Sequence, residues 1–478
     1  MTGGSSGQVP LVIDLDGALL KSDLRYEWVL HLVRRDPGAV FGILYWLARG
    51  RTAFGQFIAA SGTLDIEAIP ARDDFVAWVE GEHATGRPIV LLAADACVAE
   101  KVAARFRFID EILATDGEGD ATVGGDRADL LCKRFPQGYI YAGHSAADLD
   151  VWRRASGTVL VNASASVERQ ARAIREPLAV FPPDPPTFTT LRRALRVHQW
   201  AKNGLVFIPF LLGGKFHDPS AWAHALLGFV ALSVLASSTY LVNDLWDLGD
   251  DRRHWSKRGR PLAAGLISIQ TALIIAGVGL AASFALISWA GPAAAAMLGL
   301  YLTVALAYSF RLKREPILDA LTLAGLFTLR LGLGVAVTNV RFSPWLFVFS
   351  MFIFTSLSLA KRCTEITRMV EHGEVQPFGR GYKPSDEPLV LAMGVAAMFG
   401  ATLIMIIYLI SEAFPAGFYS HPTVLWVFPF VLFMWLARVW LLCHRGVLQD
   451  DPVAFALKDP VSLGYGTLMM IAFLAAVL

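Results

Sequence analysis

The stretch Leu241–Gly265 reads LVNDLWDLGDDRRHWSKRGRPLAAG and follows the apolar run AWAHALLGFVALSVLASSTY, which is long enough to cross a bilayer. Four aspartates fall within eight residues of this stretch, and six basic residues, counting His254, fall within the next nine. Basic residues help to orient a membrane helix, whereas acidic residues contribute little to orientation. The pattern therefore indicates chemistry at the end of a membrane helix.

The chain changes character along its length. Residues up to about 180 carry ordinary proportions of charged and apolar residues, whereas long apolar runs recur from about residue 196 onward. Between these parts lies FPPDPP, Phe181–Pro186, whose prolines disfavour both helix and sheet. We predict a cytosolic domain at 1–180, a proline-rich linker at 181–190 and a transmembrane domain at 191–478.

The second part contains nine candidate membrane spans. They lie at roughly 200–213, 221–243, 268–289, 292–309, 317–338, 344–360, 389–411, 424–443 and 461–478. Alternate connections between them hold 15 Lys or Arg, against 2 in the opposite set. The basic set is expected to face the cytoplasm. This orientation puts the acidic stretch and the first domain on the same side and the C-terminus outside.

The first part alternates short β-rich runs with helical stretches. The runs are VPLVIDLDG, RPIVLLAADA, GYIYAGHS and GTVLVNAS. This alternation predicts an α/β, Rossmann-like domain with a parallel sheet and functional residues at the carboxyl ends of the strands. The segment at about 25–75 interrupts the pattern and is predicted to be a helical cap.

Three aspartates of the opening stretch have helical spacing. If the helix continues through them, Asp244, Asp247 and Asp251 lie at about 0°, 300° and 340° around its axis. Carboxylates clustered at a membrane end repel one another unless a cation lies between them. Mg²⁺ prefers oxygen ligands and often bridges carboxylates to a phosphate or pyrophosphate. The basic residues that follow, among them His254 and Lys257, are suited to bind the other phosphate oxygens.

A second charged stretch, YSFRLKREPILDALTL, repeats the theme at another cytoplasmic span end. It offers Tyr308, Lys313, Glu315 and Asp319. An alternative is that all these charges are solvated loop residues that only orient the protein. We adopt that interpretation for Arg252 and Arg253.

These residues resemble motifs of the UbiA-type intramembrane prenyltransferases. NDLWDLGDDRRHWSKRGRPLAAG is similar to their first aspartate-rich motif, NDxxDxxxD, and YSFRLKREPILD to their second. RVHQWAKN, the HxxKxxRP continuation and the YSxxLKxxPxxD form resemble the decaprenyl-phosphate phosphoribosyltransferase branch. The sequence departs from that branch at RVHQW and HWSK. The resemblance covers about residues 190–478 and implies an all-α domain of nine transmembrane helices around a cavity.

The resemblance also implies a reaction. Members of this branch transfer phosphoribosyl from phosphoribosyl pyrophosphate to a polyprenyl phosphate and release pyrophosphate. Carried over by position, the implied catalytic and Mg²⁺-binding residues are Asp244, Asp247, Asp251 and Asp319. The implied substrate-binding residues are Gln199, Lys202, Asn243, Lys257, Arg260, Tyr308, Lys313, Lys361 and Arg362.

Two other functions stay open at this point. One is prenyl transfer from a prenyl diphosphate to an aromatic acceptor, and the other is non-catalytic binding of a lipid phosphate. Acidic residues at span ends rather than at the membrane midplane favour an enzyme over a transporter.

The N-terminal part resembles the haloacid dehalogenase superfamily over about residues 9–165. DLDGALLKSD is similar to its first motif, with Asp14 and Asp16 as implied nucleophile and acid–base, and GHSAADLD to its fourth, with Asp148 as an implied Mg²⁺ ligand. Four positions depart from the pattern: Ala18, Leu92, Arg127 and His144. The domain is therefore either a degenerate structural or regulatory module or a phosphatase for the 5-phosphate of the transferase product.

The remaining sequence features narrow the context. Four cysteines lie far apart without metal-site spacing, and the N-terminus lacks the pattern of a cleaved signal peptide. A net charge of +1 gives no indication of a nucleic-acid partner. We expect an integral protein of a bacterial-type inner membrane with its first domain and active site in the cytosol. Small-residue runs such as GPAAAAMLG are compatible with a homo-oligomer.

Overall fold

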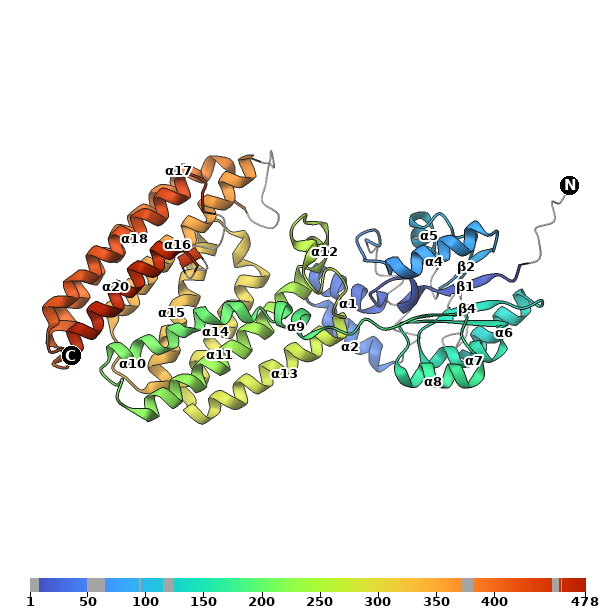
Figure 1. Cartoon of the computed structure of the whole chain (residues 1–478), viewed down its shortest axis with the longest axis horizontal. Helices are drawn as coiled ribbons and strands as arrows, with labels where there is room; N and C mark the ends of the chain where they lie inside the picture. Colours follow the sequence, from blue (N-terminus) through green and yellow to red (C-terminus); the bar gives the residue numbers. More distant parts are fainter. Residues whose placement is uncertain are drawn as a thin grey trace. The chain divides into compact units, whose positions relative to one another are not determined.

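The computed structural model describes residues 8–49, 65–93, 96–114, 124–371, 381–448, 455–456 and 458–478. The chain forms two compact bodies. One comprises Met1–Ala194 together with Asp244–Ile274, and the other comprises Leu195–Asn243 and Ile275–Leu478. The first is an α/β body and the second is all-helical (Figure 1). The segment that begins at Asp244 thus belongs to the same compact body as the N-terminal part.

The α/β body is built on a six-stranded parallel sheet in the order β3-β2-β1-β4-β5-β6. This is the strand order of doubly wound nucleotide-binding folds. The strands are β1 (Leu11–Asp14), β2 (Ile89–Ala93), β3 (Glu111–Ala114), β4 (Ile140–Gly143), β5 (Gly157–Val161) and β6 (Ala179–Phe181). The helices are α1 (Leu24–Arg35), α2 (Ala39–Ala48), α4 (Asp73–Ala84), α5 (Ala96–Arg105), α6 (Gly124–Arg134), α7 (Leu149–Arg154), α8 (Ala165–Ile174) and α9 (Phe188–Ala194).

The central strand is buried on both faces, as expected for a parallel sheet covered by helices. All four residues of β1 are buried. Leu11 and Ile13 belong to one hydrophobic cluster and Val12 to another, because successive side chains of a strand point to opposite faces. Asp14 is the last residue of this strand, so its carboxylate lies at the carboxyl edge of the sheet.

Helices α1 and α2 fall inside the predicted cap. An isolated antiparallel bridge between Leu20 and Ala71 joins the two ends of this insertion. The side chain of Asp23 caps α1 by accepting a hydrogen bond from the Arg25 amide at 2.9 Å. The base of the insertion is therefore fixed to the sheet domain.

Among the described residues, eight helices are long and apolar enough to cross a membrane. They belong to the second body, except that the end of the first helix and the start of the second lie within Asp244–Ile274 of the first body. They cover Pro219–Trp246, Ile269–Ala290, Pro292–Phe310, Leu318–Thr338, Pro344–Met369, Pro384–Ala416, Pro422–His444 and Pro460–Val477. Their main segments are α11 (Pro219–Trp246), α13 (Ile269–Ile287), α14 (Pro292–Phe310), α15 (Leu318–Thr338), α16 (Pro344–Glu371), α17 (Glu387–Tyr408), α18 (Val427–His444) and α20 (Pro460–Val477).

The first of the nine expected spans, 200–213, has a different structure. It consists of a 3₁₀-helix, η3 (Val197–Phe207), followed by the short α10 (Ile208–Leu212). Arg196, which precedes η3, is in the left-handed region with φ 49°. This segment is not one of the eight spanning helices found in the described part of the chain.

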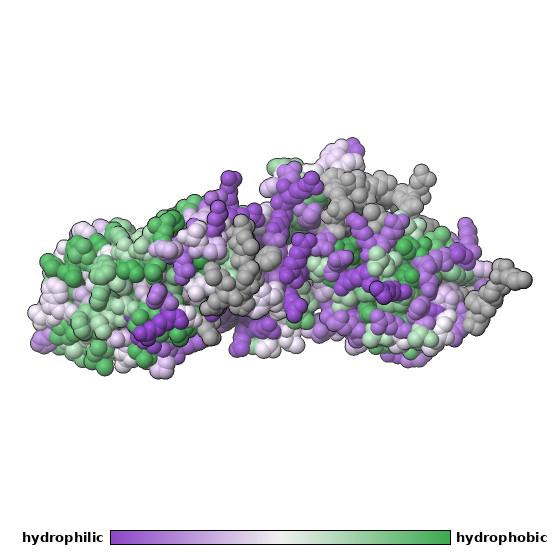
Figure 2. Space-filling model, turned by 90° about the horizontal axis from the view of Figure 1, so that it is seen from above, coloured by the Kyte–Doolittle hydropathy of each residue, from purple (hydrophilic) through white to green (hydrophobic). Residues whose placement is uncertain are grey.

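Apolar residues cover much of the visible surface of the helical body (Figure 2). Exposed large side chains include Val278, Phe399, Phe430 and Met470. A surface of this kind would be unfavourable in water and is typical of lipid contact. The protein is therefore an integral membrane protein.

Glycine permits close packing of α15 against the segment that precedes α11. A β-carbon at Gly334 would lie 2.3 Å from the Val206 carbonyl oxygen, whereas a β-carbon at Gly325 in the same helix would meet nothing within 4 Å. A backbone atom cannot move aside as a side chain can.

We predict that Gly334→Ala destabilises the helical body by about 1–3 kcal/mol, because overpacking displaces the backbone. The matched variant Gly325→Ala should be neutral or slightly stabilising, because alanine has the higher helix propensity. Thermal unfolding of both variants in detergent checks this. Equal midpoints for the two variants would contradict the close approach.

Candidate functional site

The first aspartate-rich motif lies where α11 ends. The helix stops at Trp246, Asp247 forms the turn, and the short α12 covers Leu248–Arg253. The chain thus departs from the continuous helix expected from the spacing, although the Asp251 amide still donates to the Asp247 carbonyl at 2.8 Å.

The turn brings Asp244 and Asp251 to a common partner. Both carboxylates are buried, and both accept from Nη1 of Arg260, at 3.2 Å and 2.5 Å respectively. Asp247 is half-buried at the turn between them. The Arg260 guanidinium thus supplies positive charge to both acids.

Burial decides the electrostatics of this carboxylate pair. It raises the pKa of Asp251, while the Arg260 guanidinium acts in the opposite direction and the Asp244 charge raises that pKa further. Two desolvated carboxylates repel each other, and a nearby positive charge stabilises their ionised form. The pair is therefore a suitable ligand set for a hard cation such as Mg²⁺.

A hydrogen bond joins the second motif to the first. Nζ of Lys313, in the short 3₁₀ segment Leu312–Arg314, donates to Oδ1 of Asn243 at 3.3 Å. Asn243 is the residue before Asp244 on α11. The lysine and the asparagine are both predicted substrate-binding residues, so the structure brings two members of the predicted site together.

Asp319 is held by a different arginine and a tyrosine. It is fully buried in the first turn of α15, with Nε of Arg362 at 2.6 Å and the hydroxyl of Tyr382 donating at 2.6 Å. The same tyrosine oxygen accepts from the amide of Ile317 at 2.8 Å. Ile317 has φ 67°, a costly conformation for a β-branched residue. Asp319 is thus rigidly placed and neutralised by Arg362.

The segment containing Gln199 and Lys202 is anchored by its neighbours. Trp200 Nε1 donates to Ser237 Oγ at 2.9 Å, and Asn203 accepts from Nε of Arg330 at 2.9 Å. Gln199 and Lys202, each next to one of these anchors in the chain, are half-buried, and the Lys202 ammonium lies 5.9 Å from the centre of the Phe327 ring.

The other predicted binding residues occupy separate elements. Lys257 begins the 3₁₀ segment Lys257–Gly259, Tyr308 lies in the last turn of α14, and Lys361 lies on α16 beside the buried Arg362. Arg362 also pairs with Glu365. Its guanidinium is therefore engaged with carboxylates rather than exposed to a ligand.

Three residues with defined roles were missed or misassigned from sequence. Tyr382 has no charge to reveal it, and Arg330 is a lone basic residue inside an apolar span, a signal that was available. The assignment of Arg252 as a solvated loop charge is wrong. Its side chain is 6% exposed and binds both carboxylate oxygens of Glu27.

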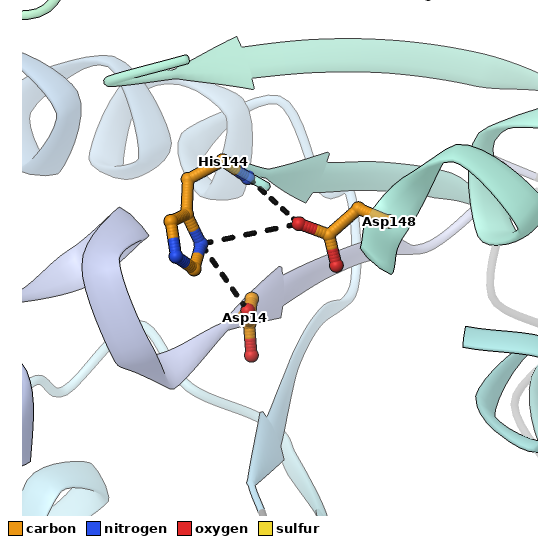
Figure 3. Close-up of side chains that lie close together, drawn as sticks. All are labelled: Asp14, His144 and Asp148. Atoms are coloured by element: carbon orange, nitrogen blue, oxygen red, sulfur yellow. Dashed lines mark hydrogen bonds and ion pairs between the residues drawn. The ribbon is translucent and has the colours of Figure 1, made fainter. Parts of the chain in front are cut away.

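The sheet domain has its own cluster, formed by Asp14, His144 and Asp148 (Figure 3). Nδ1 of His144 lies 3.5 Å from Asp14 and 3.9 Å from Asp148. One ligand atom from each residue fits within 4.8 Å, a spacing compatible with a metal ion. The side chain of Asp16 lies outside the described part of the structure.

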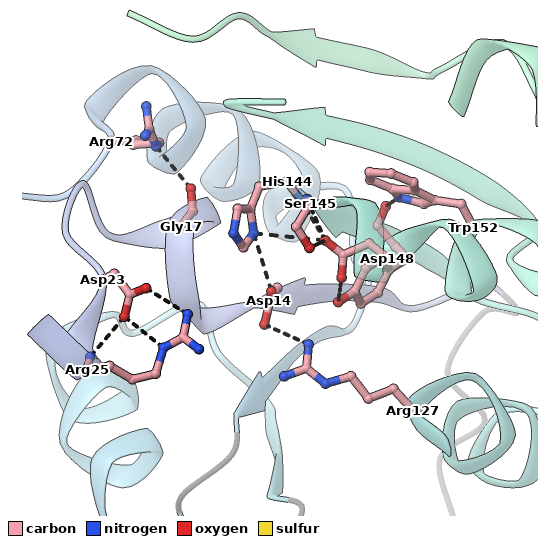
Figure 4. Close-up of polar contacts among 11 residues, drawn as sticks. Asp14, Gly17, Asp23, Arg25, Arg72, Arg127, His144, Ser145, Asp148 and Trp152 are labelled. Carbon is pink, nitrogen blue, oxygen red and sulfur yellow. Dashed lines mark hydrogen bonds and ion pairs between the residues drawn. The ribbon is translucent and has the colours of Figure 1, made fainter. Parts of the chain in front are cut away.

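Residues of the same sheet domain make polar contacts with this cluster (Figure 4). Oδ2 of Asp148 accepts from the amides of His144 and Ser145, at 2.9 Å and 2.8 Å. Arg127 lies 3.7 Å from Asp14, and burial raises the pKa of Asp14. Buried Leu92 is the strand-register neighbour of Asp14, which places an apolar side chain beside the carboxylate.

A body of long apolar helices with charged motifs at its span ends is typical of an integral membrane protein that works at the membrane surface. The UbiA prenyltransferase family matches residues 205–458. The chain therefore belongs to the UbiA prenyltransferase family.

Some relatives match nearly the whole chain, whereas others match only part of it. The uncharacterized protein y4nM of Sinorhizobium fredii is 36% identical over 472 residues, covering 98% of this chain and 91% of that protein. Decaprenyl-phosphate phosphoribosyltransferase of Mycolicibacterium smegmatis is 32% identical over 180 residues, 37% of this chain and 57% of that enzyme. A solved UbiA homolog from Archaeoglobus fulgidus bound to GPP and Mg²⁺ aligns over 60% of this chain and 98% of its own, with 16% identity and a TM-score of 0.46.

We predict that Tyr382→Phe destabilises the protein by about 1–3 kcal/mol, because the half-buried Ile317 amide loses its acceptor and the buried Asp319 loses a donor. Burial raises the pKa of Tyr382, so the hydroxyl stays protonated and able to donate. The unfolding midpoint in detergent measures the loss. Tyr465→Phe on α20 is the control, and equal effects of the two changes would contradict the assigned contacts.

Proposed function

We propose that this protein transfers a 5-phosphoribosyl group from phosphoribosyl pyrophosphate to a polyprenyl phosphate at the cytoplasmic face of the membrane. The observation that carries the proposal is the contact between the two charged motifs, in which Lys313 donates to Asn243 next to the buried carboxylate of Asp244. The 32% identity to a decaprenyl-phosphate phosphoribosyltransferase supports the choice of substrates.

The first motif offers carboxylate oxygens, the ligands that a divalent cation such as Mg²⁺ prefers. Asp244, Asp247 and Asp251 would hold Mg²⁺, and Asp319 is the candidate ligand from the second motif. When bound, Mg²⁺ would neutralise the charge that develops on the departing pyrophosphate. Arg260 already lies against two of the acids, so a cation that replaces it there would free its guanidinium to bind phosphate oxygens.

The proposed reaction is a displacement at the anomeric carbon. An oxygen of the lipid phosphate forms the new bond to this carbon, and the bond to the pyrophosphate oxygen breaks with its electron pair leaving on pyrophosphate. The lipid phosphate is already anionic, so no strong general base is needed. Lys257, Lys313 and Lys361 supply positive charge for the phosphates, while Gln199, Lys202 and Tyr308 are proposed to orient the donor.

We predict that Asp247→Asn lowers kcat by at least about 10²-fold, the scale of losing one preorganised electrostatic contact. Pyrophosphate release from phosphoribosyl pyrophosphate and polyprenyl phosphate by purified protein in detergent measures this loss. Glu412→Gln neutralises an acid outside both motifs and should leave turnover unchanged. Unchanged turnover in Asp247→Asn would instead favour a protein that only binds lipid phosphates.

The same assay separates the two transferase chemistries. Consumption of a prenyl diphosphate with an aromatic acceptor, and none of phosphoribosyl pyrophosphate, would replace this proposal with aromatic prenyl transfer. That outcome would keep the family assignment and reverse the role of the lipid from acceptor to donor.

We infer that the sheet domain is a degenerate relative of haloacid dehalogenase phosphatases. Asp14 lies close to Arg127 and His144, and its register neighbour is the apolar Leu92, the position to which the resemblance assigns a phosphate-binding hydroxyl. The alternative, an active phosphatase, would remove the 5-phosphate from the transferase product.

Labelled polyprenyl phosphoribose 5-phosphate distinguishes these two states of the domain. We expect no phosphate release by the unaltered protein, because Leu92 offers no hydroxyl beside Asp14. Phosphate release that disappears in Asp14→Asn would contradict the degenerate state and identify Asp14 as the nucleophile. Asp129→Asn, on the surface of α6, is the control for an unspecific effect.

A further inference from the structure

The segment that follows α11 is attached to the N-terminal domain at several points. We call Asp247–Ser268 the aspartate loop. Arg34 contacts Asp250 at 2.5 Å, Arg193 donates to the Gly259 carbonyl at 3.2 Å, and Arg253 donates to Asp65 at 2.9 Å. These residues all belong to one compact body, although more than two hundred residues separate Arg34 from Asp250.

The strongest of these attachments is a buried, two-point ion pair. Arg252 donates through Nη1 and Nη2 to the two oxygens of Glu27, at 3.0 Å and 2.6 Å, and each side chain is 6% exposed. The hydroxyl of Ser22 donates to the same carboxylate. A paired guanidinium and carboxylate fix direction as well as distance, because both are planar and bind side by side.

The far end of the loop also fits the N-terminal domain closely. Gly265 has φ 70°, and a β-carbon there would lie 2.9 Å from Cβ of Lys21 and 3.0 Å from Cγ of Pro70. Lys21 and Pro70 are joined by a backbone hydrogen bond at the base of the cap. The loop is therefore held both near its start and near its end.

The held residues are adjacent to the proposed metal ligands. Arg252 follows Asp251 in the chain, and Asp251 in turn accepts from Arg260, eight residues beyond Arg252 within the same loop. Any rotation of α12 that releases Arg252 from Glu27 also turns the carboxylate of Asp251. The ion pair thus lies where a small displacement changes the geometry of the acids.

We propose that Glu27 is a positioning residue for the transferase site and that the N-terminal domain serves as the scaffold of the aspartate loop. Through Arg252 it orients Asp251 for the divalent cation and the donor diphosphate. This assignment rests on the proposed function, and it gives the N-terminal domain a role that requires no phosphatase activity. The pair acts without touching substrate.

The decisive variant is Glu27→Gln in the full-length protein, which keeps the side-chain volume and removes the charge. We expect the Mg²⁺ concentration for half-maximal transfer to rise about 10-fold, the effect typical of losing a residue that orients a metal ligand. Arg252→Lys keeps the charge but loses the two-point geometry and should show a smaller rise. Asp65→Asn breaks the exposed pair with Arg253 and serves as the matched control, with no change expected.

A second readout does not depend on turnover. Hydrogen–deuterium exchange should become faster across Asp247–Ser268 in Glu27→Gln, and not in Asp65→Asn, while exchange in α15 stays unchanged. Unchanged exchange across the loop in Glu27→Gln would overturn the proposal, whatever the activity. Faster exchange with an unchanged Mg²⁺ requirement would also overturn it, because the pair would then only stabilise the loop.

The two readouts separate the failure of this inference from the failure of the proposed function. Unaltered protein that does not transfer phosphoribosyl refutes the proposed reaction. The exchange measurement, together with the binding of Mn²⁺ to unaltered and Glu27→Gln protein, then still decides whether Glu27 positions the acids. Equal Mn²⁺ affinity in the two proteins would count against the positioning role.

Discussion

The need to neutralise buried carboxylates underlies the structure of this protein. Asp244 and Asp251 share Arg260, and Asp319 is bound by Arg362 and Tyr382. A carboxylate removed from water without a positive partner is strongly unfavourable. Each motif therefore supplies its own cation within the chain, and a divalent ion would have to compete with an arginine that is already present.

This competition gives the arginines a double role in the proposed reaction. A guanidinium that neutralises a carboxylate in the free protein can bind a phosphate oxygen once Mg²⁺ has taken its place. Arg260 is suited to such an exchange, since its side chain is 29% exposed, whereas Arg362 is 1% exposed and held on both sides by acids. The first motif is thus the more open to ligands, and the second is the more rigid.

Local patterns in the sequence predicted much of the architecture. The alternation of β-rich runs and helical stretches predicted a parallel sheet, and the structure has one, with Asp14 at the end of its central strand. Eight of the expected spans correspond to long apolar helices in the described residues. The segment 200–213, predicted as a span from its apolar composition, forms a 3₁₀-helix and a short α-helix, so the count of nine spans stays a prediction.

The pairing of distant residues was beyond the sequence. Arg252 finds Glu27 across 225 positions, and Tyr382 finds Asp319 across 63, and no local periodicity carries such information. Asp244 and Asp251 share Arg260 across a turn at Asp247 rather than along a straight helix, so the geometry differs from the predicted one, and their role as metal ligands stays a prediction. Hydrophobic patterns indicate helices and strands, whereas individual polar contacts depend on the tertiary structure.

The most direct measurement of the central claim is an experimental structure of the full-length protein with phosphoribosyl pyrophosphate and Mg²⁺. The expected result is a metal ion bound by Asp244, Asp247 and Asp251, with the donor diphosphate on the ion and Arg260 turned from the carboxylates to a phosphate oxygen. A donor bound elsewhere, with Arg260 still paired to Asp244 and Asp251, would contradict it.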